Sequence, residues 1–292
     1  MIKEISQLER EETMQTAALV VSNNAYRQHF FPGYETEMQI ADILCALGRE
    51  WNVIDRGKIL AAFTVETSRT LIKFDRVCIE PSSTDEIAAE ISNLALKTPA
   101  AILAPPELED ALTKLGYERQ EIQIRLSKNP RESRIMQLHP LSNPNEKDIP
   151  ELSRLMFEAY AVSKYQKYTD LAVAERSLIA LMAKKERIFL QSSSFISKAG
   201  DKIISACLVT REHIGATISE LFTHPLYRAR GLATAELITC MNSLARARIP
   251  LLRVTVGEKN DHVLRLLSKL GFSEDTRATL MTRGCPNRSV TP

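Results

Sequence analysis

The residues best suited to chemistry lie in one segment, ELFTHPLYRARGLATAELI, which runs from residue 220 to residue 238. An apolar, strand-like run ends at Pro225, and an apolar stripe with helical spacing begins at Leu237. The first N–H groups of a helix have no partner within it and carry the positive end of its dipole, so a helix start is a natural phosphate site. Between strand and helix stand Arg228, Ala229, Arg230, Gly231, Leu232, Ala233 and Thr234.

The composition of this loop favours a di- or polyphosphate ligand. Arg228 and Arg230 supply fixed positive charge, and Gly231 allows the backbone to approach a ligand closely. The small side chain of Ala233 leaves room for a ligand at the helix start, and Thr234 adds a hydroxyl group. The sequence lacks the GxxxxGK[ST] pattern of nucleotide triphosphate sites, and no GxGxxG opens its first strand–helix unit. The expected ligand therefore belongs to another class of phosphate compound.

Length and charge limit the kind of protein that carries this loop. A chain of 292 residues suggests about two domains. The formal net charge is +2 and no long basic run is present, which argues against a nucleic-acid partner. The first residues, MIKEISQLEREE, lack the apolar core of a signal peptide, and no segment reaches membrane-spanning length. We expect a cytoplasmic protein with no membrane partner.

Cysteine and histidine patterns give no sign of a metal site. The five cysteines form no CxxC pair and are expected to be reduced structural thiols. His213, His224 and His262 show neither HxxxH nor HExxH spacing. Ser192, Ser193 and Ser194 lack a GxSxG pattern and are expected to be polar strand residues.

The elements that must position the loop occur twice along the chain. The pattern breaks near residue 130, where EIQIRLSK runs into the polar link NPRES and a new strand, RIMQLHP, follows. On each side the predicted order is helices, a hairpin, then strand, helix, strand, helix and strand. We predict two related domains in tandem, residues 1–130 and 131–292.

Two pairs of matching triplets fix the register of this repeat. Residues 79–81 match residues 223–225 as a strand end followed by proline, and residues 115–117 match 270–272 as a helix end, a glycine cap and an aromatic residue. From Pro81 to Gly116 is 35 positions, whereas from Pro225 to Gly271 is 46. The first domain is therefore shorter in the region that holds the arginine–glycine loop.

The first domain is expected to lack the phosphate site. Ser83 to Glu86 has the form of a capping box, which would satisfy the helix start internally. Asp85 and Glu86 would also place negative charge there, and an anionic ligand would be repelled.

The arrangement RxxGxA after a strand ending in Thr-His-Pro resembles the acyl-CoA-binding motif of the GCN5-related N-acetyltransferases, the GNAT superfamily. Asn260 opens a further segment, NDHVLRLLSKLGF, that is similar to the superfamily's later Asn-initiated helix. The resemblance is strongest over residues 219–272 and extends over about 134–282. For the first half it depends on element order and the two triplet pairs.

The resemblance implies an α/β (α+β) fold of two tandem GNAT-like domains, each a mixed, mostly antiparallel sheet flanked by helices. It also implies that acetyl-CoA binds as co-substrate, with its pantetheine arm between two splayed strands, here SELFTH and LLRVTV. Backbone groups of Leu221, Phe222 and Thr223 would hold that arm and polarise the thioester carbonyl. Residues 228–234 would hold the pyrophosphate, and Asn260 would be a further cofactor-binding residue.

Amine acetylation requires that a proton leave the amine, and the thiolate usually gains one. Glu220 is the candidate base, acting directly or through water; otherwise it is a surface carboxylate or an ion-pair partner. Many GNAT enzymes place a tyrosine acid where this chain has Leu267, which helical spacing marks as core. Water, another side chain or departure of an unprotonated thiolate are the alternatives.

Three tyrosines, Tyr160, Tyr165 and Tyr168, lie in or just after the helix that lines the acceptor pocket in GNAT enzymes. They are candidate acceptor contacts, with core packing as the alternative. The predicted function is transfer of acetyl from acetyl-CoA to a small-molecule or peptide amine, by direct attack and without a metal. The alternatives are a non-catalytic acyl-CoA-binding regulatory protein and a purely structural pair of domains.

Overall fold

The computed structural model describes residues 2–23, 36–46, 51–67, 72–95, 98–134, 140–161, 168, 170–182, 188–212 and 215–284. They form two compact units. The first unit contains the described residues of 2–125, 256–264 and 274–284. The second contains those of 126–255 and 265–273. The units are therefore not consecutive halves of the chain. The boundary that we place near residue 130 stays a prediction.

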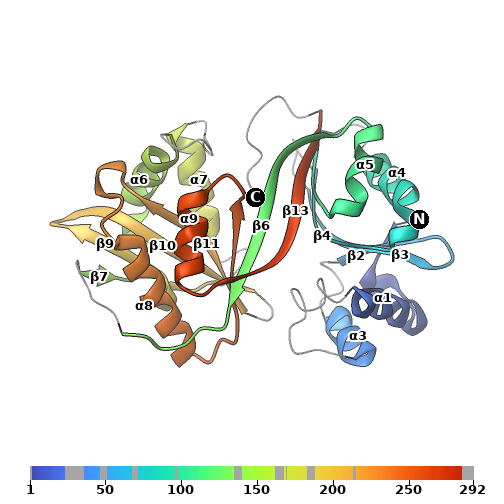
Figure 1. Cartoon of the computed structure of the whole chain (residues 1–292), viewed down its shortest axis with the longest axis horizontal. Coiled ribbons are helices and arrows are strands. Elements are labelled where there is room, and N and C mark those ends of the chain that lie inside the picture. Colours follow the sequence, from blue (N-terminus) through green and yellow to red (C-terminus); the bar gives the residue numbers. More distant parts are fainter. Residues whose placement is uncertain are drawn as a thin grey trace. The chain divides into compact units, whose positions relative to one another are not determined.

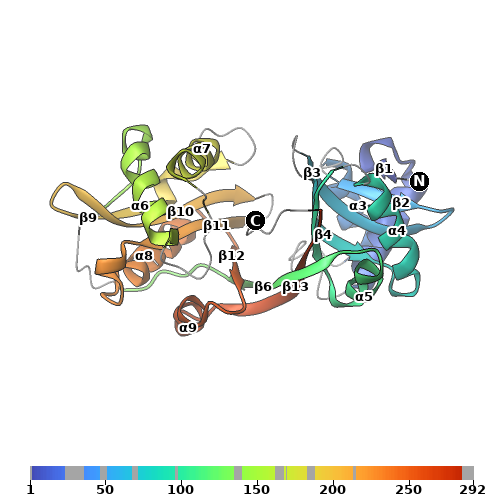
Figure 2. The same cartoon turned by 90° about the horizontal axis from the view of Figure 1, so that it is seen from above.

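The first unit is a sheet with helices on both faces (Figure 1). Its strands follow one another in the order β1-β2-β3-β4-β5-β13-β6, and β4 and β5 run parallel. Helices α1 and α3 cover one face, whereas α4 and α5 cover the other (Figures 1 and 2). The strands are β1 (Ile2–Glu4), β2 (Trp51–Asp55), β3 (Ile59–Thr67), β4 (Ile72–Ile79), β5 (Ala100–Ala104), β6 (Glu118–Lys128) and β13 (Ser273–Arg283). The helices are α1 (Arg10–Ser22), α3 (Glu37–Ala46), α4 (Thr84–Leu94) and α5 (Pro106–Lys114), with 3-10 turns η1 (Ile5–Gln7) and η2 (Pro81–Ser83).

The C-terminal strand β13 is an integral part of this first unit. It pairs antiparallel with β5 from Thr279 opposite Ala104 to Arg283 opposite Ala100. The Arg283 guanidinium donates to the carbonyl oxygens of Ser92 (3.0 Å) and Ala95 (3.2 Å) at the end of α4. The first core therefore depends on residues from the far end of the sequence.

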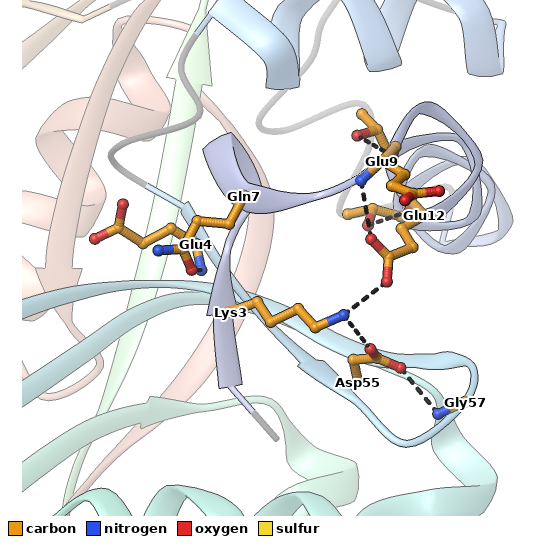
Figure 3. Close-up of polar contacts among 9 residues, drawn as sticks. Lys3, Glu4, Gln7, Glu9, Glu12, Asp55 and Gly57 are labelled. Carbon is orange, nitrogen blue, oxygen red and sulfur yellow. Dashed lines mark hydrogen bonds and ion pairs between the residues drawn. The ribbon is translucent and has the colours of Figure 1, made fainter.

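A cluster of charged groups fixes the N-terminal strand to its neighbours (Figure 3). The ammonium group of Lys3 lies 2.7 Å from a carboxylate oxygen of Glu12 on α1 and 2.8 Å from one of Asp55 on β2. Asp55 also accepts the Gly57 N–H at 2.9 Å in the β2–β3 turn. Hydrogen bonding to Asp55 and then Glu12 raises the pKa of Lys3, so this cluster keeps its charges near neutral pH.

The second unit repeats the layered arrangement. Its strands follow the order β12-β11-β10-β9-β7, with β8 paired to β10. Helices α6 and α7 pack against one face and α8 against the other (Figures 1 and 2). The strands are β7 (Leu141–Ser142), β8 (Ile188–Phe189), β9 (Phe195–Ala199), β10 (Lys202–Glu212), β11 (Gly215–Thr223) and β12 (Leu252–Gly257). The helices are α6 (Ile149–Ala161), α7 (Leu171–Met182) and α8 (Leu232–Arg246), with 3-10 turns η3 (Glu146–Asp148), η4 (Gln191–Ser193) and η5 (Pro225–Tyr227). Helix α9 (Asp261–Lys269) is divided between the units, and its residues from 265 onward belong to this one.

The triplets that mark the sequence repeat have matching structures. Gly116 and Gly271 both end a helix with positive φ, +83° and +78°. The residues that follow them, Tyr117 and Phe272, are both buried. At the other triplet, η2 and η5 each begin at the strand-ending proline. In the first unit η2 runs directly into α4, whereas residues 228–231 separate η5 from α8.

Two local predictions are wrong. Ser83 makes no side-chain cap on α4, because it belongs to η2 with φ −122° and ψ 26° and does not have the extended backbone of a capping residue. Residues 191–193 form η4 and not a strand, since the N–H groups of Ser193 and Ser194 bond within the turn, to the carbonyl oxygens of Leu190 and Gln191. The predicted strand RIMQLHP lies largely outside the described residues.

Candidate functional site

The candidate site begins where β11 and β12 separate. The parallel ladder between them consists of Ala216 opposite Leu252 and Thr217 opposite Arg253. Strand β11 then continues through Thr223 without a further β12 pair among these described residues. Backbone groups of Leu221 and Thr223 on this edge therefore pair with no β12 residue in the described part of the chain, and their part in binding a ligand stays a prediction.

An irregularity in β11 precedes this opening. The β10–β11 register shifts between Leu208, opposite Glu220, and Val209, opposite Ile218. Ser219 is thus the extra residue of a β-bulge, and its hydroxyl lies 2.8 Å from that of Thr210. A bulge increases the local twist of a strand, which explains why β11 turns away from β12 here.

The loop after β11 presents a row of N–H groups. Ala229 and Gly231 both have positive φ, +61° and +79°, which turns the chain tightly into α8. The helix begins at Leu232, no side chain caps it, and its first backbone bond runs from the Ala235 N–H to the Gly231 carbonyl oxygen at 3.0 Å. The N–H groups of Leu232, Ala233 and Thr234 precede that bond, so they have no intrahelical acceptor.

The two arginines of the loop have different surroundings. Arg228 donates to the Ala159 carbonyl oxygen at 2.8 Å and to that of Thr223 at 3.4 Å, which ties the loop to the end of α6. Arg230 donates to the Leu226 carbonyl oxygen at 3.1 Å, and its guanidinium carbon lies 5.0 Å from the centre of the Tyr227 ring. Both side chains are exposed at the helix start.

Glu220 lies on the face of β11 that α6 covers and is buried, with 7% of its surface exposed. Its carboxylate accepts hydrogen bonds from the Tyr160 hydroxyl at 2.9 Å and the Tyr168 hydroxyl at 3.0 Å. The two tyrosine rings meet edge to face, 5.5 Å apart. The sequence identified all three residues as candidates, but it did not indicate that they contact one another.

Burial raises the pKa of Tyr160 and Tyr168 well above the usual value, and the charge of Glu220 adds to this effect. Both tyrosines are therefore hydrogen-bond donors at all ordinary pH values. Tyr165, the third candidate of the group, lies outside the described residues.

Sequence reasoning missed Glu236, two residues beyond the predicted loop. This carboxyl group is fully buried between α8 and the sheet, where it accepts hydrogen bonds from Ser197 and Ser205. Burial raises its pKa to about 8. One signal in the sequence could have identified Glu236, because it is a charged residue within the apolar stripe of α8 that faces the sheet.

The remaining two positions lie on and before α9. Asn260 directly precedes that helix, and its carbonyl oxygen accepts the Leu264 N–H at 3.0 Å. It belongs to the segment 256–264 of the first unit, and its part in the site stays a prediction. Leu267 is fully buried, in agreement with the core role inferred from its spacing.

Comparison with solved structures places this geometry in a known fold. A GCN5-related N-acetyltransferase from Sphaerobacter thermophilus matches with a TM-score of 0.65, 13% identity, and coverage of 97% of this chain and 95% of that one. A tandem GNAT protein from the clavulanic acid biosynthesis pathway matches with a TM-score of 0.60, 12% identity, and coverage of 98% and 99%. The chain has the tandem GNAT fold. A GNAT-family acetyltransferase from Colwellia psychrerythraea matches with a TM-score of 0.53, 11% identity, and coverage of 97% and 98%.

The tandem GNAT fold predicted from the sequence is confirmed over almost the whole chain. No protein-family model matches the sequence, and no curated protein is similar to it at a significant level. At 11–13% identity these GNAT structures establish the fold alone. Among the described residues, every helix is too short or too polar to cross a membrane.

Proposed function

We propose that the protein is an acetyl-CoA-dependent N-acetyltransferase whose reaction takes place in its C-terminal GNAT domain, residues 131–292. The observation that carries this proposal is the uncapped start of α8 beside the opening between β11 and β12. The uncapped helix start suits a pyrophosphate group, and the opening between the two strands suits an extended arm that contains amide groups. Acetyl-CoA has both groups in series.

In this proposal residues 228–234 hold the pyrophosphate through N–H groups and Arg230. The pantetheine arm pairs with the free edge of β11 at Leu221, Phe222 and Thr223, and a β11 N–H polarises the thioester carbonyl. Arg228 is committed to backbone carbonyl groups, so it shapes the loop and contributes its charge from there.

The reaction proceeds by direct attack of a neutral amine nitrogen on the thioester carbon. The C–S bond breaks, the thiolate of CoA leaves, and the amine loses one proton. We assign that proton to the Glu220 carboxylate, directly or through water. Its two tyrosine donors keep both oxygens in a fixed orientation, and the amine acceptor approaches from the side of α6 and α7. A small-molecule or peptide amine fits this assignment.

A second candidate function is supported by a specific observation. Leu267 is buried where many GNAT enzymes have a tyrosine acid, and the Glu220 oxygens already accept two hydroxyl groups. Both features are compatible with a regulatory protein that binds acyl-CoA without turning it over.

The N-terminal domain, residues 1–130, is proposed to bind no acyl-CoA and to support the second domain. Its helix α4 starts with Asp85 and Glu86 in the first turn, which would repel a phosphate group. The turn η2 also leaves no space in the sequence for an arginine–glycine loop.

Calorimetric titration of acetyl-CoA into the full chain tests the cofactor assignment, and a panel of amines with thiol detection then tests turnover. One binding site per chain with CoA release in the presence of an amine supports the enzyme. One site without release from any amine favours the regulatory alternative. No binding overturns both.

A further inference from the structure

The feature that the proposed reaction does not use is the buried carboxyl group of Glu236. It has no exposed surface, although it lies only one helical turn from the start of α8. Its Oε1 accepts the Ser197 hydroxyl of β9 at 2.6 Å, and its Oε2 accepts the Ser205 hydroxyl of β10 at 2.9 Å. A carboxyl group so deeply placed is costly to ionise, so its location calls for a reason.

From Glu236 a chain of hydrogen bonds leads to the end of β11. The Ser205 hydroxyl lies 2.8 Å from the Thr223 hydroxyl and 3.2 Å from the Phe222 carbonyl oxygen. Three oxygens thus surround one hydroxyl, which has only one hydrogen to donate. Two of the three belong to Phe222 and Thr223, where the pantetheine arm would lie.

The protonation state of Glu236 decides where that hydrogen goes. When Glu236 is ionised, the Ser205 hydroxyl donates its one hydrogen to the carboxylate. The Thr223 hydroxyl can then bond to Ser205 only as the donor, so its own hydrogen is directed toward Ser205. When Glu236 carries a proton on Oε2, that proton is donated to Ser205, whose own hydrogen then goes to Phe222 or Thr223. The Thr223 hydroxyl is then free to donate to a ligand.

We propose that Glu236 is a positioning residue for the acyl-CoA site, which in its protonated state leaves the Thr223 hydroxyl as a donor at the strand edge. The inference assumes the proposed function, because the ligand it concerns is acyl-CoA. Ionisation of Glu236 turns the same hydroxyl inward and removes one hydrogen bond to the ligand.

In the described part of the chain, the Glu236 carboxyl group has uncharged hydroxyl and thiol groups as neighbours. The hydroxyls of Ser197 and Ser205 bond to the carboxyl group, and the thiol of Cys207 on β10 lies within reach of its charge. A hydrogen bond to Cys240, together with burial and the charge of Glu236, raises the pKa of Cys207 well above its usual value. Burial raises the pKa of Glu236 to about 8, although the serine donors oppose the shift. Ionisation of Glu236 therefore takes place at a pH at which most proteins remain folded.

The test is calorimetric titration of acetyl-CoA into the full chain at pH 7.0 to 9.5. The wild type is expected to lose affinity by about fivefold as the pH rises, the equivalent of one neutral hydrogen bond. Glu236→Gln keeps an N–H donor toward Ser205 at every pH. Its affinity for acetyl-CoA should therefore equal that of the wild type at pH 7.0 and stay constant as the pH rises. Thr223→Val should bind weakly at every pH.

Circular dichroism and thermal unfolding at each pH verify that both variants are folded. Equal pH dependence in wild type and Glu236→Gln would overturn the inference while leaving the proposed function intact. If Glu236→Gln fails to fold, loss of the pH dependence in Thr223→Val still supports the inference, and its persistence overturns it. Absence of acetyl-CoA binding by the wild type at any pH would instead overturn the proposed function, and this inference with it.

Discussion

The Tyr160 hydroxyl on α6 donates a hydrogen bond of 2.9 Å to Oε2 of Glu220 on β11. The contact joins two elements 60 positions apart in the sequence, and Tyr168 completes it from the opposite carboxylate oxygen. A buried carboxylate is tolerated when such donors replace its water. The same arrangement fixes the orientation of the candidate base.

Replacing Tyr160 with phenylalanine should leave a buried carboxylate oxygen short of a donor. We expect a loss of about 1–3 kcal/mol in unfolding free energy, measured by urea denaturation at pH 7. The double variant with Glu220→Gln should lose less than the sum of the two single variants, because their contact is shared. Tyr227→Phe, at a half-exposed tyrosine, is the matched control and should change stability by less than about 0.5 kcal/mol. If the loss in unfolding free energy of the double variant equalled the sum of the two single losses, the result would contradict a contact between Tyr160 and Glu220.

Arg230→Ala should weaken acetyl-CoA binding by about tenfold, since it removes a charged donor from the proposed pyrophosphate site. Arg246→Ala at the other end of α8 removes the same charge from an exposed position and should leave affinity unchanged. Titration of both variants against the wild type measures the difference. Equal affinities for all three proteins would remove the pyrophosphate assignment.

The pKa of Glu236 predicts a loss of stability with rising pH. A glutamate with a folded pKa of about 8 and a usual value of 4.5 binds more protons in the native state than in the unfolded one between these pH values. Its contribution is fully present below about pH 4.5 and is lost as the pH rises to about 8, at up to about 1.4 kcal/mol per pH unit. Glu236→Gln should lack this slope and be the more stable protein at pH 9.

Urea denaturation at pH 5.5, 7.0 and 8.5 measures this slope. Glu118→Gln, at an exposed glutamate of β6, is the control and should follow the wild type at each pH. Parallel curves for the wild type and Glu236→Gln would show that the carboxyl group is not perturbed.

Arg283→Ala should destabilise the first unit although it changes the far end of the chain. The guanidinium bonds to Ser92 and Ala95 and lies 4.8 Å from the centre of the Tyr117 ring. We expect a cost of about 2–4 kcal/mol. Trp51, the one tryptophan of the sequence, is buried in β2 of this unit, so its fluorescence reports the unfolding directly. Arg277→Ala, on the same strand but exposed, is the control.

A fragment that ends near residue 130 should not reproduce the first unit, because it lacks β13. Fluorescence and circular dichroism of residues 1–130 should show an incompletely folded protein. If the fragment unfolded cooperatively, with the same change in Trp51 fluorescence as the full chain, the result would contradict this expectation.

Ala229→Gly should be neutral or stabilising by about 0.5 kcal/mol, since glycine removes the strain of a non-glycine residue at φ +61°. Ala245→Gly, at a residue with helical backbone in the last turn of α8, should instead destabilise the protein, by up to about 1 kcal/mol. Thermal unfolding of the two variants distinguishes them. A similar loss in both would mean that residue 229 does not have this backbone conformation.

Much of the candidate site could be predicted because its signals are local. A proline ends β11, two arginines and Gly231 follow, and a helix begins within a few residues. The glycine caps at Gly116 and Gly271 likewise depend on backbone conformations that few other residues adopt. The capping role of Ser83 was predicted wrongly, because the adjoining 3-10 turn changed the backbone geometry that capping requires.

The sequence by itself determined the order of elements, the repeat and the loop at the start of α8, since each depends on residues that are neighbours in the chain. Tertiary structure alone decided that β13 completes the first unit, that Tyr160 and Tyr168 bind Glu220, and that Glu236 meets Ser197 and Ser205. Strand partners and buried polar contacts join positions far apart in sequence. They form only where burial leaves no water to satisfy these groups, a condition set by the packing of the whole chain.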